Sequence, residues 1–130
     1  MSNLKTQNQN LNLKTDLRKR SFRFSLMVLE FVKLLPNTKV YWVITDQLIR
    51  AATSIGANII EARSSSSKRD FIRFYEIALK SANETRYWLY LLREGMLVER
   101  EKVDDLIKEV EEIGSMLGSS LLTLKGKKKL

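Results

Sequence analysis

The side chains that could do chemistry in this chain are its charged ones, because the sequence contains no His and no Cys. Without these residue types there can be no Ser-His-Asp triad, thiol nucleophile, zinc finger or disulfide. The usual proton shuttle at neutral pH is missing as well. The composition therefore predicts a protein that is not an enzyme and that has no catalytic residue and no cofactor.

Four glutamates, Glu30, Glu61, Glu76 and Glu84, raise the question of a metal site, since the core of a helical bundle can hold two metal ions. Such sites combine glutamates with Glu-x-x-His pairs, and this chain cannot supply the histidines. The sequence therefore predicts no metal site.

Basic residues dominate both ends of the chain. Lys and Arg number 23 against 15 Asp and Glu, which gives a formal charge of +8. Residues 1–20 and 125–130 each contribute +4, whereas residues 21–124 are neutral. Such ends can bind polyanions in a salt-sensitive way, and the alternative is that they only keep the protein soluble. The candidate contacts are Arg18, Lys19, Arg20, Lys125, Lys127, Lys128 and Lys129.

A second basic group consists of Lys68, Arg69, Arg73 and Lys80. Positions 69, 73 and 80 share one side of a helix, because they are four and seven residues apart. This strip could contact phosphates. The alternative, which the interleaved acidic residues favour, is an ordinary solvated helix face.

Arg50, Asn58 and Glu61 are polar residues on or beside an apolar helical stripe. They could form a polar ligand pocket. The alternative is a set of polar contacts that fix helix register or a subunit interface, and an Asn in a helical seam favours this second interpretation.

The spacing of apolar residues predicts four helices to position these side chains. Pro36 ends the first helix, and Asn37 or Thr38 caps the start of the second. Ser67 caps the start of the third helix, and Gly95 is expected to end it in the left-handed conformation. The predicted helices cover residues 21–35, 38–63, 68–94 and 99–124. Their short connections favour an all-α, antiparallel, up-down-up-down four-helix bundle. Residues 1–20, rich in Asn and Gln at their start, are expected to be disordered, and residues 125–130 form a basic tail.

Two of these helices have more apolar surface than one core requires. Ten of the fifteen residues in 21–35 are large and apolar, whereas burying one face takes about three or four per seven. The third helix carries two apolar seams. We therefore expect both helices to have a second neighbour.

No uncharged apolar run approaches the roughly 18 residues of a membrane span, and the first residues lack the apolar core of a secretory signal. The expectation is a cytoplasmic protein with no membrane partner.

Residues 50–62 (RAATSIGANIIEA) resemble the R-A-A-x-S-I-x-A-N-I-x-E signature of the four-helix bundle proteins encoded in 23S rRNA intervening sequences. Residues 67–74 (SKRDFIRF) resemble the start of that family's third helix. Gly56 stands where the family often has proline, which predicts a straighter second helix. The resemblance implies a homopentamer. It also implies a relationship to the accessory variability determinant proteins of diversity-generating retroelements, which are basic pentameric barrels that work with a reverse transcriptase and nucleic acid. For the intervening-sequence branch itself, it implies no established biochemical activity.

The sequence thus predicts a non-enzymatic, pentameric helical bundle that acts as an accessory or scaffold protein. Its expected partners are RNA or DNA and a nucleic-acid-processing protein. The alternative is an oligomeric adaptor that binds another protein and has no nucleic-acid role.

Overall fold

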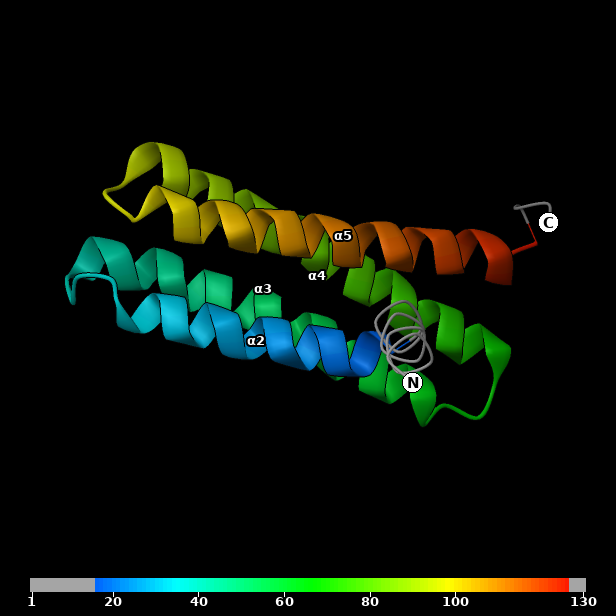
Figure 1. The fold of residues 1–130 in the computed structure, drawn as a ribbon. Coiled ribbons are helices and arrows are strands. Elements are labelled where there is room, and N and C mark those ends of the chain that lie inside the picture. The colour runs from blue at the N-terminus through cyan, green and yellow to red at the C-terminus, as the bar shows by residue number, and fades with distance from the viewer. Residues whose placement is uncertain (1–15, 127–130) are drawn as a thin grey trace, which may run out of the picture.

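A computed structural model describes residues 16–126 of the chain, and this part is all-α. It contains four helices, α2 (Leu17–Lys33), α3 (Lys39–Arg63), α4 (Lys68–Gly95) and α5 (Arg100–Leu124), and no strand (Figure 1). The all-α, four-helix prediction is therefore confirmed.

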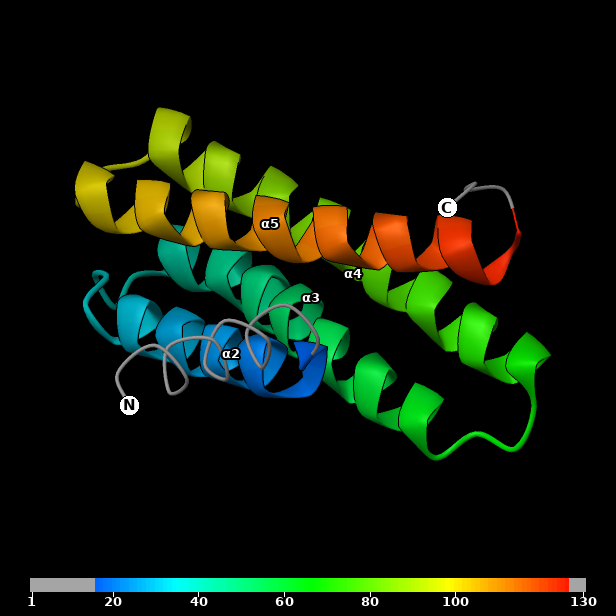
Figure 2. The ribbon, with the colours of Figure 1, turned by 45° about the vertical axis from the view of Figure 1, so that its right-hand side comes forward.

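Each helix packs against its neighbours in sequence, and α2 also packs against α5. Figures 1 and 2 agree on how the helix ends are grouped. The start of α2, the turn between α3 and α4, and the end of α5 lie at one end of the structure. The α2–α3 and α4–α5 turns lie at the other. At this second end the Tyr41 hydroxyl donates to the carbonyl of Leu97 over 3.0 Å and accepts from its amide over 3.2 Å.

The first helix begins four residues earlier than the sequence predicts. Asp16 caps it, since its carboxylate accepts a hydrogen bond of 3.2 Å from the backbone N–H of Lys19. This bond is the main reason why the pKa of Asp16 lies below its ordinary value. The segment 17–20, predicted to belong to a disordered tail, is instead the first turn of α2. Residues 1–15 lie outside the described residues.

The other helix boundaries lie within two residues of the predicted ones. The Ser67 hydroxyl accepts a hydrogen bond of 3.1 Å from the backbone N–H of Asp70, which is the predicted cap of α4. Gly95 does not adopt the predicted left-handed conformation. It is the last residue of α4, and Gly126 is the one residue with a positive φ among residues 16–126.

The core consists of the apolar stripes that the spacing predicts. The central seam of α5 is buried throughout, at Val103, Leu106, Val110, Ile113 and Leu117. Burying one such side chain contributes about 1.5–3 kcal/mol. The fully buried partners from the other helices include Phe24, Val28, Leu48, Ile55, Ile59, Leu89 and Leu92.

Helices α2 and α3 approach closely at Gly56. A Cβ atom added there would lie 3.2 Å from the Ser21 hydroxyl, closer than ordinary van der Waals contact. Helix α3 runs through Gly56 without a break. The small residues in the middle of α3 therefore allow a close contact with α2.

Candidate nucleic-acid interface

Basic side chains gather at the end of the structure where α2 begins and α5 ends. Residues 16–20, 61–76 and 116–126, which we call the basic end, carry eight basic and four acidic side chains. Residues 30–46 and 91–105, at the opposite end, carry five basic and seven acidic ones. The basic side chains of the basic end are Arg18, Lys19, Arg20, Arg63, Lys68, Arg69, Arg73 and Lys125.

Arg20 points into the fold. Its Nε and Nη2 atoms lie 2.8 and 2.9 Å from the two carboxylate oxygens of Glu109, and Nη2 lies 3.1 Å from Glu112. The hydrogen bonds that the guanidinium donates to Glu109 raise the pKa of Arg20 above its ordinary value. The side chain is 15% exposed. Arg20 therefore joins α2 to α5 and offers little surface to a phosphate.

Arg18, Lys19 and Lys125 are exposed and have acidic neighbours. The first two lie 3.6 and 3.9 Å from Asp16, and Lys125 lies 2.7 Å from Glu76. Exposed pairs of this kind contribute about 0–1 kcal/mol. A phosphate can therefore compete for these three cations.

The predicted strip on α4 is exposed along its whole length. Arg73 lies 3.9 Å from Asp70, and its guanidinium carbon is 4.6 Å from the centre of the Phe74 ring. Within residues 16–126, Lys68, Arg69 and Lys80 form no ion pair. Lys80 lies farther along α4, where it shares with Lys125 an open pocket of about 540 Å³ between α4 and α5.

The three polar residues of the α3 motif do not form a common pocket. Arg50 is exposed and lies 3.7 Å from Asp46, and Glu61 is exposed as well. Asn58 is half-buried and donates to the carbonyl and the hydroxyl of Ser54, over 2.8 and 3.0 Å. Ser81 of α4 donates to the same hydroxyl over 2.9 Å. Asn58 thus belongs to a polar link between α3 and α4.

Lys127, Lys128 and Lys129 lie outside the described residues. The chain reaches them through Gly126, and it enters α2 through Asp16, so both terminal segments join the fold at the basic end.

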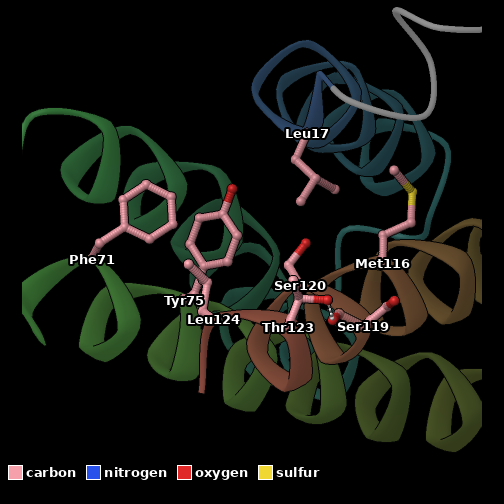
Figure 3. Close-up of a pocket in the computed structure, with 8 residues that line it drawn as sticks. All are labelled: Leu17, Phe71, Tyr75, Met116, Ser119, Ser120, Thr123 and Leu124. Carbon is pink, nitrogen blue, oxygen red and sulfur yellow. Dashed lines mark hydrogen bonds between the residues drawn. The ribbon is translucent and has the colours of Figure 1, made fainter. Parts of the chain in front are cut away.

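Sequence reasoning missed a pocket at the basic end, formed by the start of α2, the first turns of α4 and the last turns of α5. Its volume is about 490 Å³. Figure 3 shows Phe71 and Tyr75 of α4 facing the hydroxyl side chains of α5, with Leu17 above them. The signal in the sequence was Ser120, which interrupts the apolar seam of α5. The pocket is lined by Leu17, Phe71, Tyr75, Met116, Ser119, Ser120, Thr123 and Leu124.

The outer face of α2 is apolar. Phe22, Leu26 and Leu29 are four and three residues apart and are 61%, 48% and 38% exposed. They lie opposite the buried Phe24 and Val28. Contiguous exposed apolar surface of this kind is typical of an interaction site.

No group of acidic residues within residues 16–126 is arranged to hold a metal ion, and no helix there is long and apolar enough to cross a membrane. The structure thus defines an all-α, four-helix protein with one basic end.

Residues 14–119 match the family described as 23S rRNA-intervening sequence protein, and the chain belongs to this family. It is also similar to a crystal structure at 1.70 Å of a protein of unknown function from the S23 ribosomal protein family of Bacteroides thetaiotaomicron VPI-5482. The two are 38% identical with a TM-score of 0.75, over 81% of this chain and 97% of the other. A comparison with curated proteins finds no match.

Proposed function

We propose that this protein is a non-enzymatic, homo-oligomeric helical bundle that acts as a nucleic-acid-associated accessory or scaffold protein in the cytoplasm. Its partners in this proposal are RNA or DNA and a nucleic-acid-processing protein, as the resemblance to the accessory variability determinant proteins implies. The observation that carries the proposal is the basic end, where exposed cations from α2, α4 and α5 meet the points at which both terminal segments join the fold.

The arrangement of the helices supports phosphate contacts because it brings cations together at one end. The total charge alone does not show where the cations lie. The three segments of the basic end, which are far apart in the sequence, lie at one end of the structure. Contacts of cations with phosphates release counterions, do not depend on base sequence, and weaken as salt rises. In an oligomer the same patch is repeated, so that a long strand engages several copies at once.

The apolar outer face of α2 supports self-association. Phe22, Leu26 and Leu29 would be buried if this face packed against a second copy, as the surplus of apolar residues in α2 predicts. We propose that five copies form a closed ring, as the family resemblance implies.

Fluorescence anisotropy of labelled RNA and DNA tests the nucleic-acid role. We expect binding at about 50 mM salt that weakens tenfold or more at about 200 mM. The double variant Lys68→Glu/Arg69→Glu should weaken binding by about tenfold. The control Lys33→Glu/Lys39→Glu makes the same change of charge at the opposite end and should bind like the wild type. Absence of binding at low salt would contradict the proposal.

Light scattering tests the oligomer. The wild type should show a mass near five chains, and Leu26→Glu should lower it. The control is Leu97→Glu, which places the same charge on a side chain that is 89% exposed in the α4–α5 turn. A wild-type mass near that of one chain would overturn the proposed pentamer.

The second candidate is an oligomeric adaptor that binds another protein. The exposed aromatic side chains Trp42 (55%) and Tyr87 (59%), on α3 and α4, favour it. An oligomer that fails to bind RNA and DNA at low salt would support this function instead.

A further inference from the structure

We infer that the pocket at the basic end receives one unpaired nucleotide, with the base between Phe71, Tyr75 and the hydroxyl groups of α5, and the phosphate toward Arg18 and Arg63. This inference rests on the proposed function and specifies which form of nucleic acid the protein selects. The ligand chemistry is that of a nucleoside monophosphate, either free or within a single strand.

The Tyr75 hydroxyl is open to the pocket. Tyr75 as a whole is 7% exposed, and its hydroxyl makes no hydrogen bond with any part of the chain that the structure describes. The hydroxyl is not one of the buried polar atoms without a partner in the described residues, so it keeps contact with solvent. In Figure 3 it points into the space between α4 and α2. A phenol hydroxyl can both donate and accept, so it is available to a ligand that enters the pocket.

Two aromatic side chains form one wall of the pocket. The rings of Phe71 and Tyr75 lie 4.6 Å apart, centre to centre, with their planes tilted by 34°. Phe71 is half-buried, so part of its ring remains accessible at the pocket. Aromatic side chains of this kind stack on bases without regard to base identity.

The wall of the pocket that faces the aromatic rings is formed by α5, where Ser119, Ser120 and Thr123 line the pocket. The Thr123 hydroxyl donates to the carbonyl of Ser119 over 3.2 Å, which leaves its oxygen able to accept. The hydroxyl groups of Ser120 and Thr123 can pair with donors and acceptors on the edge of a base. The acyl chain of a lipid would offer these hydroxyl groups no hydrogen-bond partner. The pocket chemistry therefore favours a base.

Exposed cations lie at the same end of the structure as the pocket. Arg63 ends α3, Arg18 lies in the first turn of α2, and both are exposed. Burial raises the pKa of Tyr75, and the positive charges of Arg63 and Arg18 oppose this rise. The two cations would also attract a phosphate attached to the bound nucleotide.

A paired base cannot enter such a pocket without leaving its stack, which makes the selection of single strands the measurable consequence. The experiment compares a single-stranded oligonucleotide that contains 2-aminopurine, a duplex of the same length, and a free nucleoside monophosphate. We expect the single strand to bind about tenfold more tightly than the duplex, as one stacked base allows. The fluorescence of 2-aminopurine should fall on binding.

Ser120→Phe fills the pocket and should reduce single-strand affinity to the level of the duplex. The control Ser115→Phe adds the same ring on an exposed part of α5 and should have no effect. Circular dichroism and melting check that both variants fold. Tyr75→Phe keeps the ring and removes the hydroxyl, and it should weaken single-strand binding about threefold, in line with one lost hydrogen bond.

Equal affinity for strand and duplex, or unchanged single-strand affinity in Ser120→Phe, would overturn the inference while the proposed function stands. If neither nucleic acid binds at low salt, the proposed function fails. In that case, binding of the free nucleoside monophosphate is the measurement that tests the inference. Binding that Ser120→Phe abolishes supports a pocket for free nucleotides, and no binding overturns it.

Discussion

Arg20, in the first turn of α2, donates two parallel hydrogen bonds, of 2.8 and 2.9 Å, to the carboxylate of Glu109 on α5. The two residues are 89 positions apart, so this contact joins the first helix to the last. A guanidinium and a carboxylate fit each other in this two-point geometry, which gives one defined orientation of the helices. The contact therefore fixes how α2 lies against α5 near the basic end.

We predict that Arg20→Ala lowers the free energy of unfolding by about 2 kcal/mol, because it leaves the partly buried Glu109 without its partner. Urea denaturation followed by circular dichroism measures this change. The control is Lys33→Ala, whose pair with Glu30 has side chains that are 70% and 74% exposed. This control should change the stability by less than about 0.5 kcal/mol.

A double-mutant cycle with Glu109→Ala sharpens this prediction. If the two side chains stabilise the fold through each other, the double variant should be less destabilised than the sum of the single variants. Strictly additive effects would show that the pair contributes no coupling energy.

The contact of Gly56 with Ser21 gives a second prediction. Replacing a helical Gly by Ala gains about 1 kcal/mol of helix propensity. Here the new methyl group would lie 3.2 Å from a hydroxyl that is fully buried and that donates to the carbonyl of Arg18. We expect Gly56→Ala to destabilise the protein despite its propensity, as the midpoint of urea unfolding would show.

Two further variants separate the clash from the propensity. Gly118→Ala makes the same change in α5 at a position where an added Cβ meets no atom within 4 Å, so it should stabilise. Ser21→Ala combined with Gly56→Ala should recover part of the loss, because the hydroxyl is gone. If Gly56→Ala alone stabilises the protein, the prediction is wrong, and α2 can shift away from the added methyl group at little cost.

Local patterns predicted the helices because each signal lies within a few residues. The cap formed by Ser67 and the amide of Asp70 spans three positions, and the buried seam of α5 repeats every three to four. Asp16 supplies the same kind of local cap for α2. It was missed because the cations that follow it, together with the Asn- and Gln-rich segment before it, gave residues 1–20 the composition of a tail.

The features of the candidate site could not be predicted because they depend on contacts between distant segments. No pattern near Arg20 indicates that its partner is Glu109. The sum of charges by segment gives residues 21–124 no net charge, but α2 begins at Leu17 and so adds Arg18, Lys19 and Arg20 to the bundle. The sum also contains no information on which segments meet. The order of the helices brings Arg18, Lys68 and Lys125 to one end. It also creates a pocket from the ends of three helices, at which Tyr75 is buried.

The polar link between α3 and α4 gives a third prediction. The Ser54 hydroxyl accepts from both Asn58 and Ser81. Ser54→Ala should therefore cost more stability than Ser81→Ala, because it removes the common acceptor of two half-buried donors, whereas Ser81→Ala removes one donor. We expect about 2 kcal/mol and about 1 kcal/mol respectively. Thermal melting of the two variants compares them, and the reverse order would contradict the shared-acceptor geometry.

The burial of Tyr75 gives a fourth prediction, on the behaviour of the protein at alkaline pH. Burial raises the pKa of its hydroxyl above the ordinary value of about 10, because the phenolate loses its hydration. The folded protein therefore holds this proton more tightly than the unfolded chain does. The resulting stability is fully present below pH 10 and is lost as the pH rises from there through the folded pKa.

Tyr75→Phe has no proton to lose at this position, so its unfolding free energy should fall less over this range. Tyr87→Phe, which changes an exposed ring, should keep the full alkaline loss. Urea denaturation at a series of pH values between about 8 and 11 measures all three proteins, and parallel curves for the wild type and Tyr75→Phe would rule out this contribution.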